Sequence, residues 1–126
     1  MIEIKPFENA SQYVENADNH TFALVAADGD EVLGYGVLRL FDTYAIIDDI
    51  HFENDTDMLS LGYGMGKALL NFIERRSVYH VYSSLDNPRL LERLRFKKDV
   101  KIKPEEYLPC ENEYYVNLEG YFNTHC

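Results

Sequence analysis

Apolar and polar residues alternate along several parts of the chain, and this period of two is typical of β-strands. The second and third of these segments are separated by Asp28-Gly29-Asp30-Glu31, and the glycine there can supply the positive φ of a tight hairpin turn. The pattern predicts six strands, at residues 1–7, 21–27, 32–40, 44–52, 80–84 and 113–119.

The two faces of the strand at residues 44–52 differ in chemistry. Successive side chains of a strand point to opposite faces. We therefore expect Asp48 to meet a helix-covered side, unless a bulge rotates the strand, and Asp49 to lie on the other face. The two expected sets are the even positions Ile46, Asp48, Ile50 and Phe52, and the odd positions Ala45, Ile47, Asp49 and His51.

Two segments carry apolar residues at helical spacing. The first predicts a helix at residues 67–77, and the second, which opens on Pro88, predicts one at residues 88–94. Residues 10–17 have room only for a short helix. The order of elements indicates a single α/β (α+β) domain with a mixed sheet that spans residues 1–126.

Charge is spread unevenly over the chain. The 126 residues include 12 Lys+Arg and 22 Asp+Glu, a net charge of −10, and an acidic surface repels nucleic acid. Residues 1–63 hold 2 basic and 13 acidic residues, residues 64–103 hold 10 and 4, and residues 104–126 hold 5 acidic residues and no basic ones. The basic middle is either a solvated helix face or a side that meets an anionic partner.

The sequence gives no sign of a membrane segment or a metal site. No apolar run approaches the ~20 residues of a membrane span, and the first seven residues lack the pattern of a secretion signal. Cys110 and Cys126 are the only cysteines, too few for a disulfide framework, and the four histidines show no metal-ligand spacing with them. We therefore expect a cytoplasmic protein without a metal or a membrane partner.

Three closely spaced glycines, Gly62, Gly64 and Gly66, precede the predicted helix at residues 67–77. Glycines allow close approach of a ligand, and the N–H groups that open a helix can bind anionic oxygen. A nucleotide P-loop would need glycine at position 61 and Ser or Thr at 68, where the chain has Leu61 and Ala68. The spacing also differs from the Gly-x-Gly-x-x-Gly of dinucleotide sites. A glycine turn with no ligand remains the structural alternative.

The segment Leu61-Gly62-Tyr63-Gly64-Met65-Gly66-Lys67-Ala68-Leu69-Leu70 resembles the acyl-CoA motif of the GNAT family of N-acetyltransferases. That motif reads (Gln/Arg)-x-x-Gly-x-(Gly/Ala) and is commonly followed by an Ala-Leu-Leu helix. The resemblance covers residues 22–96, and Leu94-Arg95-Phe96 is similar to the Leu-Gly-Phe ending of the family. It implies a GNAT-like, mostly antiparallel sheet with a splayed central strand at residues 44–52, flanked by helices. The N-terminal helical region, residues 8–20, is reduced.

The resemblance also implies a cosubstrate, acetyl-CoA, and the residues that hold it. Backbone N–H groups of residues 61–67 would bind the pyrophosphate, and the main chain of residues 50–52 would pair with the pantetheine arm, which Asn87 would face. The implied cofactor-binding residues are Ile50, His51, Phe52, Leu61, Gly62, Tyr63, Gly64, Met65, Gly66, Lys67 and Asn87.

The chain departs from the family pattern at several positions. Leu61 stands where the family has Arg or Gln, and Lys67 or Arg95 could compensate. Leu91 stands where many relatives have a tyrosine that protonates the thiolate. The reduced N-terminal region leaves the acceptor side either open or completed by a second subunit of a homodimer. The possible substitutes for the tyrosine are Tyr107, Tyr114 and Tyr115.

Asp49 and His51 are the candidate catalytic residues, because amine acylation needs a group that takes the proton of the amine. The alternatives are an ion-paired or acceptor-binding carboxylate at Asp49 and a surface or core histidine at His51. We expect an N-acyltransferase that moves acetyl from acetyl-CoA to a primary amine, on a small molecule or a peptide, by direct attack in a ternary complex. The alternative is a CoA-binding or regulatory module of the same fold without efficient catalysis.

Overall fold

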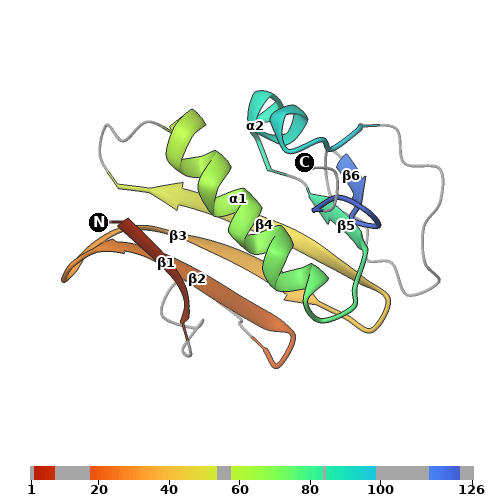
Figure 1. Cartoon of the computed structure of the whole chain (residues 1–126), viewed down its shortest axis with the longest axis horizontal. Coiled ribbons are helices and arrows are strands. Elements are labelled where there is room, and N and C mark those ends of the chain that lie inside the picture. Colours follow the sequence, from red (N-terminus) through yellow and green to blue (C-terminus); the bar gives the residue numbers. More distant parts are fainter. Residues whose placement is uncertain (1, 8–17, 54–57, 84, 99–113, 123–126) are drawn as a thin grey trace.

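The computed structural model describes residues 2–7, 18–53, 58–83, 85–98 and 114–122. They form one six-stranded sheet with two helices packed on the same face (Figure 1). The predicted strands are confirmed within a few residues, and the short helix expected at residues 10–17 lies outside the described residues. The elements are β1 (Ile2–Phe7), β2 (Thr21–Asp28), β3 (Glu31–Leu40), β4 (Tyr44–Phe52), α1 (Met58–Glu74), β5 (His80–Ser83), α2 (Pro88–Arg93) and β6 (Tyr114–Asn117).

Strand order in the sheet follows the sequence, β1-β2-β3-β4-β5-β6. Every neighbouring pair is antiparallel except β4 and β5, which are parallel and joined by the crossover helix α1. The hairpin between β2 and β3 turns at Gly29, whose φ of +62° confirms the predicted tight turn. The fold is therefore the mixed, mostly antiparallel α+β architecture that the sequence predicts.

The main core lies between the sheet and the two helices. Leu38 of β3, Ile47 of β4 and Leu69 of α1 are completely buried there, together with Leu91 of α2. A second, smaller cluster on the opposite face contains Tyr44, Ile46 and Tyr82. Because apolar side chains of β4 belong to both clusters, this strand is held at the centre of the sheet.

Helix α1 corrects one prediction about the glycine segment. The helix begins at Met58, not at residue 67, and it ends at Glu74. Gly64 and Gly66 are therefore helical residues, not part of a turn before the helix. Burial outweighs the low helix propensity of glycine here, because Met65 packs on Gly36 of β3 and an added Cβ at Gly66 would meet Leu94 at 2.4 Å.

A bulge interrupts the expected alternation of side chains along β4, and the expected faces are wrong for residues 45–48 and correct for residues 49–52. Val37 of β3 pairs with Asp49, while Leu38 pairs with Ile47, so Asp48 is an extra residue that forms a β-bulge. The bulge shifts the phase of the strand by one residue. Ala45, Ile47, Ile50 and Phe52 consequently all belong to the helix-side core, and Asp49 and His51 lie on the other face.

Candidate functional site

The central strands β4 and β5 part from each other halfway along β4. They pair only through residues 44–47 of β4 and 80–83 of β5. Beyond Ile47, β4 continues to Phe52 with β3 on one side and, among the described strands, no neighbour on the other. In Figure 1, β4 runs on well past the end of β5. The strand edge in this split is a place where an extended ligand could pair with the main chain.

Ser83 lies at the point where the two strands separate. Its buried hydroxyl donates to the carbonyl oxygen of Ile47 at 2.9 Å and accepts from the N–H of Leu85 at 3.2 Å. These two bonds provide partners for a main-chain carbonyl of β4 and for an N–H just beyond β5, at the point where the two strands stop pairing. The hydroxyl therefore stabilises the start of the split.

The direction of the main-chain groups follows from the pairing with β3. The N–H of Glu53 donates to the carbonyl oxygen of Leu33 at 2.8 Å. Because main-chain groups alternate in direction along a strand, those of His51 also point toward β3. The N–H and C=O groups of Ile50 and Phe52 point toward the split. Of the three residues expected to pair with a pantetheine arm, these two have the suitable orientation.

Asp48, the extra residue of the bulge, is bound by Arg39 of β3. The guanidinium Nε lies 2.7 Å from Asp48 Oδ2, and Nη2 lies 2.8 Å from Oδ1. Both side chains are about 30% exposed, at 31% and 28%, so the pair is half-buried. Asp48 therefore does not meet the helix-covered side but lies on the opposite face, with its charge balanced by Arg39.

Asp49 and His51 lie together on the face that α1 does not cover, as predicted for this pair. Partial desolvation raises the pKa of the Asp49 carboxyl above its ordinary value, although the charge of His51 and a hydrogen bond from the N–H of Ile50 act in the opposite direction. His51 packs against Tyr35 with ring centroids 5.2 Å apart, and its Nε2 lies 3.7 Å from Glu53 Oε1. A raised pKa makes this carboxylate a better proton acceptor than an ordinary aspartate, which suits a general base.

The glycine segment has a different geometry from that expected. In an α-helix that begins at Met58, the N–H groups without a helical acceptor belong to about the first four residues, Met58 to Leu61. The N–H groups of the later residues, up to Lys67, donate to carbonyl groups of the helix itself. An anion would therefore meet the N–H groups of the first turn, one to two turns before Gly64 and Gly66.

The other residues singled out in the sequence have structural partners. Asn87 caps α2, and its Oδ1 accepts from the N–H of Leu90 at 3.2 Å. Leu91 is completely buried, and Tyr114 packs in the same core. Tyr115 lies on the opposite face, where its hydroxyl is 2.7 Å from Nδ1 of His80. Tyr107 lies outside the described residues.

Cations of the basic segment gather on the helix side of the sheet. The ammonium of Lys67 lies 4.6 Å from the ring centroid of Tyr121, and the guanidinium carbon of Arg95 lies 4.8 Å from it. Arg93 lies 4.7 Å from the ring centroid of Tyr63. These cations face away from the side that carries Asp49 and His51.

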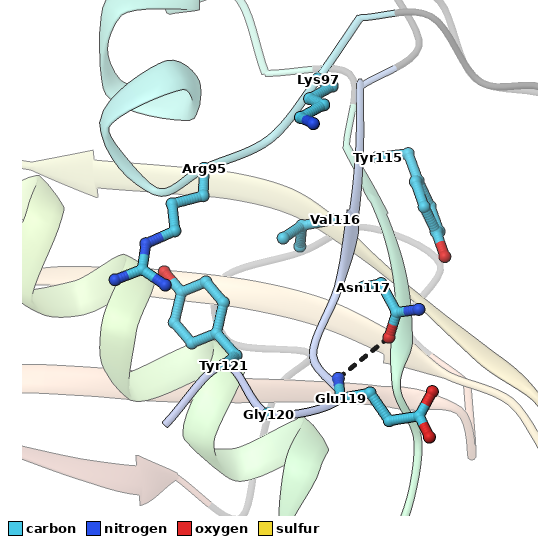
Figure 2. A pocket seen from close by; sticks show the side chains of 8 residues that line it. All are labelled: Arg95, Lys97, Tyr115, Val116, Asn117, Glu119, Gly120 and Tyr121. Atoms are coloured by element: carbon cyan, nitrogen blue, oxygen red, sulfur yellow. Dashed lines mark hydrogen bonds between the residues drawn. The ribbon is translucent and has the colours of Figure 1, made fainter. Parts of the chain in front are cut away.

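A pocket of about 300 Å³ lies beside this cluster, between the end of α2 and the segment that follows β6. Figure 2 shows Arg95, Lys97 and Tyr121 on one side of β6, with Tyr115 directed away on the other. Asn117, which lines this pocket, pairs with His80 at the first residue of β5, whereas the split begins after Ser83 at the last. Tyr115, which also lines the pocket, pairs with Tyr82, so the pocket extends along β6 beside β5, and none of its lining residues belongs to β4.

Two residues of the site were not singled out in the sequence. Ser83 gives no pattern that distinguishes it from other serines, because its role depends on contacts between distant strands. Arg39 is one of only two basic residues in the first 63, so a cation within an apolar strand was a usable signal for a buried partner. Among the described residues, no group of His, Cys, Asp and Glu side chains could hold a metal ion, and neither α1 nor α2 has the length and apolar character needed to cross a membrane.

Comparison with known proteins gives matches only at the level of structure. No protein-family model and no curated protein matches the chain. An acetyltransferase of the GNAT family from Staphylococcus aureus Mu50 matches with a TM-score of 0.71 and 11% identity, over 94% of this chain and 99% of the other. Mutant forms of a spermidine/spermine N-acetyltransferase from Vibrio cholerae match with a TM-score of 0.69 and 13% identity, over 98% of both chains.

A third structure is an acetyltransferase from Bacillus subtilis in complex with CoA. It matches with a TM-score of 0.68 and 14% identity, over 94% of this chain and 99% of the other. At such identities the likeness concerns the fold and not the activity. The arrangement of the sheet, the split between β4 and β5 and these three structures agree: the chain has the GNAT fold in a divergent form.

Proposed function

We propose that the protein is an acyl-CoA-dependent N-acyltransferase that moves acetyl from acetyl-CoA to a primary amine by direct attack in a ternary complex. The observation that carries this proposal is the split between β4 and β5, which leaves the edge of β4 at Ile50 and Phe52 without a neighbouring strand among the described residues. Acetyl-CoA would supply the activated acyl group. We further propose that residues 1–126 act as one domain in the reducing cytoplasm, as the cysteine content favours.

The CoA side of the site is proposed to follow β4 and α1. The C=O of Ile50 and the N–H and C=O of Phe52 would pair with the pantetheine amides, because the N–H of Ile50 bonds to the Asp49 carboxyl, and the first turn of α1 offers N–H groups to a pyrophosphate. Lys67 and Arg95 take over the charge of the Arg or Gln that Leu61 replaces. Their position on the helix side of the sheet, the side on which α1 packs, supports this assignment.

The acceptor side is proposed to be the opposite face of β4. Asp49 would take the proton of the attacking amine, directly or through water, and His51 would assist. Asp49 and Glu53 also favour a cationic amine over a neutral one. The similarity to the fold of a spermidine/spermine N-acetyltransferase supports this class of acceptor.

A second candidate function is a CoA-binding module without efficient catalysis. Leu91 favours it, because this side chain is completely buried at the position where the family resemblance implies a proton-donating tyrosine. Tyr114, a possible substitute, is only 6% exposed. The two candidates share the CoA side of the site and differ in turnover.

One experiment separates these candidates. Binding of acetyl-CoA is measured by titration calorimetry, and turnover is measured as thiol release with a panel of monoamines, diamines and peptides. Binding together with thiol release that depends on the amine supports the enzyme. Binding without release supports the module, and the absence of binding contradicts both.

A further inference from the structure

The bulge residue Asp48 requires support that the sheet does not provide. The ladder pairs Ile47 with Leu38 and Asp49 with Val37, so the main chain of Asp48 has no paired residue opposite it on β3. A bulged residue of this kind interrupts the ladder and changes the direction of the strand locally. The next residues, Asp49 and Ile50, carry the proposed acceptor and CoA contacts.

Arg39 provides this support from the neighbouring strand. It is paired with Ile46, two residues before the bulge, and its side chain reaches diagonally to Asp48. Two hydrogen bonds of 2.7 and 2.8 Å join one planar group to the other. Such a bidentate contact fixes the orientation of a carboxylate, which the single ammonium of a lysine cannot do.

The two residues that follow Asp48 belong to different parts of the proposed site: Asp49 to the acceptor side and Ile50 to the CoA side. We propose that Arg39 is a positioning residue: its guanidinium holds the bulge at Asp48 and thereby orients the Asp49 carboxylate and the main chain of Ile50. This inference rests on the proposed function, because it concerns the same site. Arg39 itself acts through Asp48 and is not assigned a contact with a reacting atom.

The register of β4 does not depend on the ion pair alone. Ile47 and Ile50 are both buried under α1, on either side of the bulge, and this burial keeps the bulge at its place. Loss of the ion pair should therefore leave the fold intact and change the local path of the strand. This separation makes positioning measurable apart from stability.

The test uses Arg39→Lys, which keeps the charge and loses the bidentate contact, and Arg39→Met, which loses both. Arg76→Lys and Arg76→Met are the matched controls, because Arg76 donates to the carbonyl of Phe72 and stacks on its ring at the far end of α1. We expect kcat to fall about tenfold or more in both Arg39 variants, with a smaller change in the KM of the amine and an unfolding midpoint like that of the controls. An Arg39→Lys variant with wild-type kcat would overturn the proposal, because the charge alone would then suffice.

A second measurement is independent of activity. Amide NMR spectra of the protein alone should show that the signals of Asp49 and Ile50 move in both Arg39 variants and stay in place in the Arg76 variants. If the wild type binds no acetyl-CoA, the proposed function fails, and these spectra alone decide the positioning role. Unmoved signals in Arg39→Lys and Arg39→Met would overturn it in either case.

Discussion

Asp48 and Asp49 are adjacent in the chain but have different chemical environments. Asp48 is joined to Arg39 by two short hydrogen bonds, whereas desolvation raises the pKa of Asp49. One carboxylate is therefore held as a charged structural group and the other is adjusted toward accepting a proton. Two carboxyls with opposite environments are a common arrangement where one of them acts as an acid or base.

Asp49→Asn should lower kcat by about 100-fold and leave the affinity for acetyl-CoA almost unchanged, because the variant cannot take up the proton of the amine. The wild-type kcat should fall as the pH decreases through the raised pKa of Asp49, since protonation removes the base. This decrease of kcat at low pH should be absent in Asp49→Asn. Thiol-release kinetics over a pH series and calorimetry measure the two effects.

Asp42→Asn is the matched control, because Asp42 is exposed in the bend before β4. Its kcat, its pH dependence and its affinity for acetyl-CoA should equal those of the wild type. A carboxyl whose pKa is raised by folding binds its proton more tightly in the folded state, so ionisation at neutral pH opposes folding. Asp49→Asn should therefore unfold at a temperature no lower than the wild type at pH 7. Unchanged kinetics in this stable variant would contradict the role of Asp49.

Ser83→Ala tests the start of the split. The change removes a buried hydroxyl that bonds both the carbonyl of Ile47 and the N–H of Leu85, and it should destabilise the fold by about 1–3 kcal/mol. Thr43→Ala, at an exposed bend, should lower the free energy of unfolding much less. Urea unfolding of the two variants measures the difference, and equal stability would show that Ser83 does not hold the split.

At the scale of the elements, α1 shows why a glycine motif can mislead. Three glycines favour a turn by propensity alone, and the sequence interpretation placed the start of the helix nine residues too late. The apolar residues Leu61, Met65 and Leu69 continue one stripe at helical spacing and were the better signal. The need for a small residue at Gly66 against Leu94, and at Gly36 against Met65, depends on tertiary contacts, which no local pattern contains.

One pair of variants distinguishes the packing of Gly64 from that of Gly66 in α1. Gly66→Ala should destabilise the fold by about 1–3 kcal/mol, because the added Cβ meets the buried Leu94 side chain. Gly64→Ala meets no atom within 4 Å and should stabilise the helix by about 0.5–1 kcal/mol. Thermal unfolding measures both changes, and equal effects of the two substitutions would contradict the packing argument.

Gly64→Ala also tests whether Gly64, a residue of the acyl-CoA motif, contributes to CoA binding. If Gly64 serves the close approach of CoA, this variant should bind acetyl-CoA more weakly in calorimetry although it is more stable. Unchanged binding would show that an anion meets only the first turn of α1, where the N–H groups have no acceptor within the helix.

Strand β4 shows what the sequence could and could not reveal about the site. The strand bounds are predictable because 44–52 is a dense apolar run, whereas its central place is expected from the family resemblance. The phase change is not predicted by simple alternation, although two successive aspartates between Ile47 and Ile50 interrupt the pattern. Reading that interruption as a bulge would have placed Asp48 correctly, whereas its pairing with Arg39 requires the register of β3.

At the scale of the whole molecule, the uneven charge of the sequence becomes a difference between two faces. Lys67, Arg93 and Arg95 lie on the helix side, against aromatic rings. Asp49 and Glu53 lie on the other side of the sheet, near His51. A reaction between an anionic cosubstrate and a cationic acceptor is favoured by this separation, because each partner meets opposite charge on its own side.

This separation predicts how salt affects the choice of acceptor. The KM of a diamine should rise severalfold between about 0.01 and 0.1 M salt, as the screening length falls from about 30 to about 10 Å, while the KM of a monoamine rises less. The kcat should change little, because the proton transfer is local. Glu53→Gln should reduce the salt dependence for the diamine, and Asp42→Asn, before the start of β4, should retain it. If the KM of the diamine is independent of salt in the wild type, the acidic face does not attract the acceptor, and a cationic amine is the wrong class of substrate.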